Sequence, residues 1–154
     1  MVKNSESVPW MPAPDYGRSL SGLSISLLVR DIDRAVAFAR EVLGADVVHG
    51  DADFAVLRLA AAPAAGGAVA EWMLHADHTY GEHPLLGLTG DGAQRGVGAE
   101  LRLHGCDPDA AATRAGRRGD PVLAPPADKP HGLREAYLVD PDGYVWVPDV
   151  PLKG

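Results

Sequence analysis

The sequence predicts an α+β fold built from two copies of one unit, in which a strand and a helix are followed by three more strands. In each half of the chain a short apolar strand leads into an aspartate, and an amphipathic stretch then runs to a glycine. These stretches, from Asp31 to Gly44 and from Asp107 to Gly119, have almost equal lengths. Short strands follow each of them, so the repeat implies two curved sheets that cover each other's apolar faces.

The first unit begins with a strand over residues 23–30, and Asp31 then stands where a helix N-cap is expected. The helix is predicted to run to about Leu43, because apolar side chains recur at helical spacing and Gly44 supplies the stop. Three short strands should follow, over residues 47–48, 54–59 and 69–75.

The second unit repeats this order. A strand over residues 98–105 precedes Asp107, which should cap a helix to about Arg118. A short strand over 121–124 follows, and then two strands over 133–139 and 144–149. The turn Asp140-Pro-Asp-Gly143 joins the last two, since these residue types favour tight turns.

Four segments follow from this organisation. They are an N-terminal arm (1–20), a first unit (21–80), a linker (81–96) and a second unit (97–152), the two units together forming one domain. Several prolines interrupt the arm, so we expect it to be extended and to pack on the surface through Trp10 and Tyr16.

Composition narrows the class of protein. The formal net charge is −7 and arginine and lysine do not cluster beyond Arg117-Arg118, which argues against nucleic-acid binding. No apolar run reaches the roughly 18 residues that a membrane span needs, and the start has no signal-peptide core. The single cysteine, Cys106, fits a cytoplasmic protein and is expected to be a buried filler.

One predicted strand carries an unusual set of charged side chains. Glu100, Arg102 and His104 share one face of the strand at 98–105, whereas Leu101 and Leu103 share the other. Soluble proteins often have a polar, solvent-facing strand face of this kind. The alternative is that the three ionisable side chains line a binding cavity.

Three stretches carry a resemblance to a known family. They read LLVRDIDRAVAFAREVLGADVV, LRLHGCDPDAA and YLVDPDGYVWV. The chain resembles the vicinal oxygen chelate superfamily from about Leu23 to Val150; this superfamily includes glyoxalase I, bleomycin-resistance proteins, extradiol dioxygenases and fosfomycin-resistance enzymes. The resemblance implies two βαβββ modules whose curved mixed sheets surround a cup-shaped cavity, usually in a homodimer.

The resemblance also implies four positions where metal-dependent members hold a divalent ion. Here they are Ser24 and Glu71 in the first unit and Glu100 and Val147 in the second. Valine offers no ligand atom and serine is a poor one, so we expect the usual glyoxalase-type site to be absent.

A shifted metal site remains open. His75 shares its strand face with Glu71, and His75, Glu100 and His104 would form a two-histidine, one-carboxylate set if the two strands met across the cup. Such a set would hold a divalent Zn, Ni, Mn or Fe ion. The alternative is a hydrogen-bonded pocket wall or an ion pair between Glu100 and Arg102.

Two further stretches offer ligand-binding candidates. His78 and Tyr80 follow the strand that ends at His75, where loops beside a cup often gate it, although Asp77 there would also suit a simple turn. His131 and Arg134 precede the Asp140 turn and would bind a carboxylate or another anion. For Arg134 the alternative is a surface ion pair with Glu135 or Asp142.

Three functions follow from these observations. The first is a small-molecule-binding protein of the bleomycin-resistance type that sequesters a cationic drug or metabolite. The second is a metal-dependent lyase, isomerase or dioxygenase that uses the shifted site to act on a small oxygenated substrate. The third is a metal-free enzyme with Glu100 as catalytic base and Arg102 or Arg134 as anion holder. The cup would form within one chain or between two chains that exchange modules.

Overall fold

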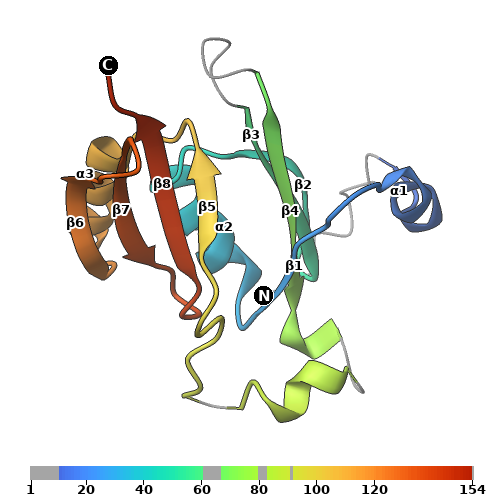
Figure 1. Cartoon of the computed structure of the whole chain (residues 1–154). Coiled ribbons are helices and arrows are strands. Elements are labelled where there is room, and N and C mark those ends of the chain that lie inside the picture. The colour runs from blue at the N-terminus through green and yellow to red at the C-terminus, as the bar shows by residue number, and fades with distance from the viewer. Residues whose placement is uncertain (1–10, 61–66, 80–82, 91, 154) are drawn as a thin grey trace.

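The computed structural model describes residues 11–60, 67–79, 83–90 and 92–153 (Figure 1). Sheet A contains, in spatial order, β1 (Ser26–Val29), β4 (Val69–Ala76), β3 (Phe54–Ala60) and β2 (Asp46–Gly50). Sheet B contains, in the same order, β5 (Leu101–His104), β8 (Val145–Pro151), β7 (Leu133–Val139) and β6 (Val122–Asp128). The helices are α1 (Ala13–Ser19), α2 (Ile32–Glu41) and α3 (Pro108–Arg118), with short 3₁₀ turns η2 (Asp77–Thr79) and η3 (Pro84–Gly87).

The two sheets have identical topology. In each of them the first strand runs parallel to the last, β1 to β4 and β5 to β8, and the other neighbours are antiparallel. This is the βαβββ unit twice over, in mixed sheets, so the predicted α+β repeat is confirmed.

Both predicted helix starts and the second predicted stop are confirmed by their caps. The carboxylate of Asp31 accepts a hydrogen bond from the backbone N–H of Arg34 at 3.0 Å, and that of Asp107 accepts from Asp109 and Ala110. Gly119 follows α3 with φ +80°, in the left-handed conformation that ends many helices.

The two units share one hydrophobic core. Helix α2 packs on sheet A and α3 on sheet B, and the rings of Trp72 and Trp146 meet across the units with centroids 5.0 Å apart. Cys106 lies in this core beside Leu43, and burial raises the pKa of its thiol to about 11. The expectation of a buried filler cysteine is therefore confirmed, and the raised pKa disfavours the thiolate, which is the reactive form.

The connection between the units is held by a buried arginine that sequence patterning did not single out. Arg95 donates two hydrogen bonds to the carboxylate of Asp77, at 2.8 and 2.6 Å, and a third to the backbone oxygen of Leu28 at 2.9 Å. A second link joins the backbone N–H of Arg30 to Asp142 at 2.9 Å. The bonds of Arg95 attach the connection to the ends of β1 and β4, whereas the Arg30 bond joins the first unit directly to the turn between β7 and β8.

The prediction of an extended N-terminal arm is wrong for residues 13–19, which form α1. Proline is tolerated in the first turn of a helix, where its missing N–H has no partner to lose, and Pro14 lies in that turn. Tyr16 is buried against the sheet as expected, and Trp10 lies outside the described residues.

Each sheet also has a face without α2 or α3. On sheet A this face carries α1, which Figure 1 shows on the side away from sheet B. The predicted site residues of β4 and β5 point to these faces, since they alternate with core residues along each strand. None of the helices in the described part of the chain is long and apolar enough to cross a membrane.

Candidate functional site

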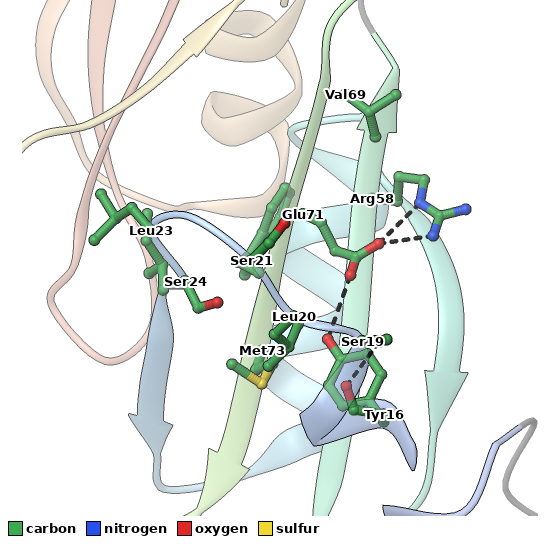
Figure 2. Close-up of a pocket in the computed structure, with 12 residues that line it drawn as sticks. Tyr16, Ser19, Leu20, Ser21, Leu23, Ser24, Arg58, Val69, Glu71 and Met73 are labelled. Carbon is green, nitrogen blue, oxygen red and sulfur yellow. Dashed lines mark hydrogen bonds and ion pairs between the residues drawn. The ribbon is translucent and has the colours of Figure 1, made fainter.

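A cavity of about 510 Å³ lies between α1 and the strands of sheet A (Figure 2). Strands β3 and β4 form its floor, and α1 with the following segment, residues 20–25, covers it. The lining residues are Tyr16, Ser19, Leu20, Ser21, Leu23, Ser24, Ile25, Arg58, Val69, Glu71, Trp72 and Met73. Hydroxyl groups and aliphatic side chains thus share the wall with one ion pair.

Glu71 is the acidic group of this cavity. Arg58, its direct neighbour on β3, donates to Glu71 Oε2 from Nε at 3.0 Å and from Nη2 at 2.7 Å. The other oxygen, Oε1, accepts a hydrogen bond from the Tyr16 hydroxyl at 3.3 Å. Figure 2 shows the carboxylate between these two partners, so one oxygen is held firmly and the other by a longer bond.

Tyr16 brings α1 onto the sheet. Its ring meets Phe54 edge to face, with centroids 6.1 Å apart. Burial raises the pKa of the Tyr16 phenol, and the nearby Glu71 carboxylate raises it further. The hydroxyl therefore stays protonated at neutral pH and donates to Glu71. The sequence predicted that Tyr16 packs on the surface but gave no sign of its bond to Glu71.

Ser24 and Glu71 both line the cavity, although they are 47 positions apart in the chain. The parallel register of β1 and β4 explains this, because it pairs Ser26 with Met73 and so brings the residues before them together. These are two of the four positions that the family resemblance indicated.

His75 lies further along β4 on the same face. Its Nδ1 is 2.8 Å from the Ser26 hydroxyl, and its ring packs against Phe54 with centroids 4.7 Å apart. Burial lowers the pKa of His75, and His83 lowers it further. The imidazole is therefore neutral at pH 7.

On sheet B, Arg102 is the centre of a charged network on the face opposite α3. Its guanidinium donates to Glu135, to Asp149 at 3.3 Å and to Glu100 at 2.9 Å. Glu135 and Asp149 are neighbours across β7 and β8 and are only 3% and 1% exposed. Burial opposes the ionisation of Glu135, but hydrogen bonds from Arg102 and His131 outweigh it and lower its pKa.

Two histidines complete this network. His104 Nδ1 lies 2.8 Å from Asp149, and His131 Nε2 lies 3.2 Å from Glu135. The one guanidinium on this face is thus shared by three carboxylates, those of Glu100, Glu135 and Asp149. Since Asp149 accepts from Nδ1–H, the lone pair of His104 is on Nε2 of an exposed ring.

The sequence predicted Glu100, Arg102 and His104 as one strand face and His131 as a separate candidate; the structure brings His131 to them through Glu135 and adds Asp149, two carboxylates that the sequence analysis did not place in the site. A signal for Asp149 existed: if the strand at 98–105 pairs in parallel with the last strand, His104 falls opposite Asp149, as the register shows. Nothing in the local sequence marks Glu135.

Other predicted site residues lie elsewhere. His78 pairs with Asp53 at 2.8 Å in η2, just beyond the end of β4. Arg134 points to the opposite face of β7 from Glu135, where it binds Asp109 of α3 and Asp128. The surface ion pair expected as the alternative for Arg134 is therefore present, with different partners from those foreseen. Tyr80 lies outside the described residues.

The four family metal positions do not fit a divalent ion within this chain. Val147 is fully buried hydrocarbon, and Glu71 and Glu100 are each bonded to an arginine. His75 is bonded within sheet A, whereas Glu100 and His104 are bonded within sheet B. Across residues 11–60, 67–79, 83–90 and 92–153, no three histidine, cysteine or acidic side chains are grouped to hold a metal. The His75, Glu100 and His104 set stays a prediction that would need a second chain.

Comparisons with known proteins agree with this architecture. A family model described as the glyoxalase/bleomycin resistance protein/dioxygenase superfamily matches residues 23–147. TioX from Micromonospora sp. ML1 is 25% identical, with a TM-score of 0.56 over 86% of this chain and 99% of TioX. A protein of unknown function from Agrobacterium tumefaciens is 21% identical, with a TM-score of 0.62 over 88% of this chain and 99% of that one.

A third solved structure has a more descriptive name. A glyoxalase/bleomycin resistance protein/dioxygenase family enzyme from Burkholderia phytofirmans PsJN is 20% identical, with a TM-score of 0.59 over 84% of this chain and 97% of the enzyme. A search of curated proteins finds no match.

Proposed function

Because the chain belongs to the glyoxalase/bleomycin resistance protein/dioxygenase superfamily, we propose that it is a small-molecule-binding protein that sequesters a cationic drug or metabolite. The observation that carries the proposal is the cavity of about 510 Å³ on sheet A, with the Glu71 carboxylate inside it. Its volume falls within the roughly 300–1,000 Å³ that small-molecule sites occupy.

The side chains that line the cavity are suited to binding an amphipathic cation. Leu20, Ile25 and Met73 offer apolar surface to a hydrocarbon or aromatic part, and the hydroxyls of Ser19 and Ser24 offer polar contacts. Glu71 Oε1 accepts the longer hydrogen bond, from Tyr16, so a ligand ammonium gains a charge-assisted bond there. The net charge of −7 also attracts cations from solution.

The superfamily typically forms dimers, and we propose a homodimer for this chain too. In a dimer the face of sheet B that carries Arg102 and His104 would be available to complete a cup with sheet A of the other copy. Sedimentation velocity at micromolar concentration tests the state, since a mass near 32 kDa, twice 16.1 kDa, supports it and a mass of 16.1 kDa contradicts it.

Binding of dansylcadaverine tests the proposed function. This probe joins an environment-sensitive fluorophore to a primary ammonium, and neutral dansylamide is its matched control. We expect dansylcadaverine to bind more tightly than dansylamide, and Glu71→Gln to weaken its binding by about tenfold because a partly buried charge-assisted hydrogen bond is lost. Glu41→Gln is the control variant, because Glu41 pairs with Arg118 away from the cavity. Equal binding of both probes, or no effect of Glu71→Gln, contradicts the proposal.

One observation favours a second candidate, an enzyme that moves a proton on a small oxygenated substrate. Asp149 is buried and orients His104 through Nδ1, which leaves Nε2 as a proton acceptor on an open face. Glu100 remains the alternative base, held by Arg102. An NMR measurement of the His104 tautomer in the wild type and in Asp149→Asn tests the orientation. A wild-type ring protonated at Nδ1, with the proton moving to Nε2 in the variant, supports it, and the same tautomer in both removes the basis for this candidate.

A further inference from the structure

Helix α1 lies over the cavity, but little of the helix itself is buried. Of its seven residues only Tyr16 is buried, and the others are exposed to solvent. Residues 21–24, which follow α1, are also exposed, with Leu23 at 92%, although Ser21, Leu23 and Ser24 line the cavity. Because so little surface of α1 and the following segment is buried, moving them away from the sheet requires little free energy.

We propose that α1 is a lid over this cavity, that the Tyr16 hydroxyl is its latch, and that a ligand ammonium opens the lid by replacing Tyr16 at Glu71 Oε1. This inference rests on the proposed function and adds how access to the site is controlled. It also identifies Tyr16 as a competitor of the ligand, not as one of its binding partners.

The hydrogen-bond geometry at Glu71 supports an exchange of partners. Arg58 fixes Oε2 through two short bonds, so the carboxylate keeps its place when the partner of Oε1 changes. The Tyr16 bond of 3.3 Å is long for an O–H···O bond, which usually measures 2.5–3.0 Å. An ammonium bound at the same oxygen carries a full positive charge, so it adds an ion-pair attraction to the carboxylate that the neutral Tyr16 hydroxyl lacks. Ligand binding thus replaces a weak bond with a stronger one.

The segment behind α1 provides a hinge. Gly22 has φ +67°, a left-handed conformation that glycine adopts without strain, and a Cβ placed on it would meet no atom within 4 Å. Three residues later the chain is fixed, because the backbone oxygen of Ile25 accepts from Met73 N–H at 2.9 Å at the start of sheet A. Rotation near Gly22 therefore moves α1 and leaves β1 and the floor of the cavity unchanged.

The variant Tyr16→Phe distinguishes a latch from a ligand contact, because the two roles predict opposite signs. If the hydroxyl competes with the ligand, its removal makes dansylcadaverine bind about three- to tenfold more tightly and associate faster in stopped-flow fluorescence. If the hydroxyl contacts the ligand, binding weakens. The matched control is Tyr137→Phe, since the Tyr137 hydroxyl also donates to a carboxylate, Glu135, but on sheet B.

Hydrogen–deuterium exchange of residues 13–19 gives a second, independent measurement. We expect faster exchange in Tyr16→Phe without any probe, and faster exchange in the wild type when dansylcadaverine is bound. Unchanged or weaker affinity in Tyr16→Phe, or slower exchange of α1 on binding, overturns the lid. A failure of the proposed function gives a different result, because neither the wild type nor any variant then binds dansylcadaverine. The hydrogen–deuterium exchange of Tyr16→Phe without probe still tests the latch in that case.

Discussion

Arg102 compensates two carboxylates that sheet B buries almost completely. Glu135 and Asp149 face each other across β7 and β8, and the same guanidinium reaches both. Placing two negative charges this close is unfavourable unless a cation lies between them. Arg102 is therefore needed for the stability of the sheet, whatever ligand this face binds.

Replacing Arg102 by methionine should destabilise the protein by about 3 kcal/mol, because it removes the guanidinium that pairs with both buried carboxylates. The double variant Arg102→Met with Glu135→Gln should recover much of this loss. Chemical denaturation in urea measures both.

A control for this prediction lies one residue from Glu135. Arg134 also binds two carboxylates, Asp109 and Asp128, but at the exposed surface, so Arg134→Met should cost less than about 1 kcal/mol. Equal losses for the Arg102 and Arg134 variants would contradict the role assigned to burial.

At the scale of the elements, the features that the sequence predicted best are those that depend on neighbouring residues in the chain. Asp31 and Asp107 cap the helices, and the Asp140 turn joins β7 to β8, because caps and turns depend on neighbouring residues. Helix α1 was missed because it is short, follows two prolines and is stabilised by Tyr16 contacts with distant strands. Such contacts depend on the register of the sheets.

The same reason separates the candidate site residues that were found from those that were missed. Glu100, Arg102 and His104 alternate along one strand and can be recognised within it. Glu135 and Asp149 become their partners only when β5, β8 and β7 are aligned side by side. The sequence alone does not give the register of these strands, so it does not reveal that Glu135 and Asp149 lie beside Arg102.

The turn between β7 and β8 depends on Gly143 for a specific steric reason. Its φ is +95°, and a Cβ there would lie 2.8 Å from Gln94 Cγ and 3.0 Å from the backbone nitrogen of Arg95. Gly143→Ala should therefore cost more than the roughly 1–3 kcal/mol typical of a strained backbone alone.

The matched control is Gly119→Ala at the end of α3. Gly119 has φ +80°, but a Cβ on it would meet no atom within 4 Å, so only the backbone strain applies. Thermal unfolding compares the two variants, and a larger loss for Gly119→Ala would contradict the steric role assigned to Gly143.

At the scale of the whole molecule, the buried aspartate of this turn should make stability depend on pH. Burial raises the pKa of Asp140 to about 6, although hydrogen bonds from Trp146, Tyr144 and Asp142 oppose the shift. The folded state therefore binds this proton more tightly than the unfolded state. The stabilisation from Asp140 is complete below about pH 4 and is lost as pH rises through about 6.

Comparison with Asp140→Asn isolates this contribution, because the other titratable groups are shared. The free energy of unfolding of the wild type, relative to the variant, should fall by up to about 3 kcal/mol between pH 4 and pH 7. Urea denaturation at several pH values measures it. A difference that rises with pH would mean that the hydrogen bonds, and not burial, determine the titration of Asp140.

The function proposed for the whole molecule requires that a small cation binds in the cavity between α1 and sheet A. The most direct measurement is a titration of isotope-labelled protein with dansylcadaverine, followed by backbone NMR. We predict saturable chemical-shift changes at residues that line the cavity, such as Leu20, Ser24, Glu71 and Met73, and at α1. Changes confined to the Arg102 and His104 face of sheet B, or no saturable change at all, would contradict cation binding in this cavity.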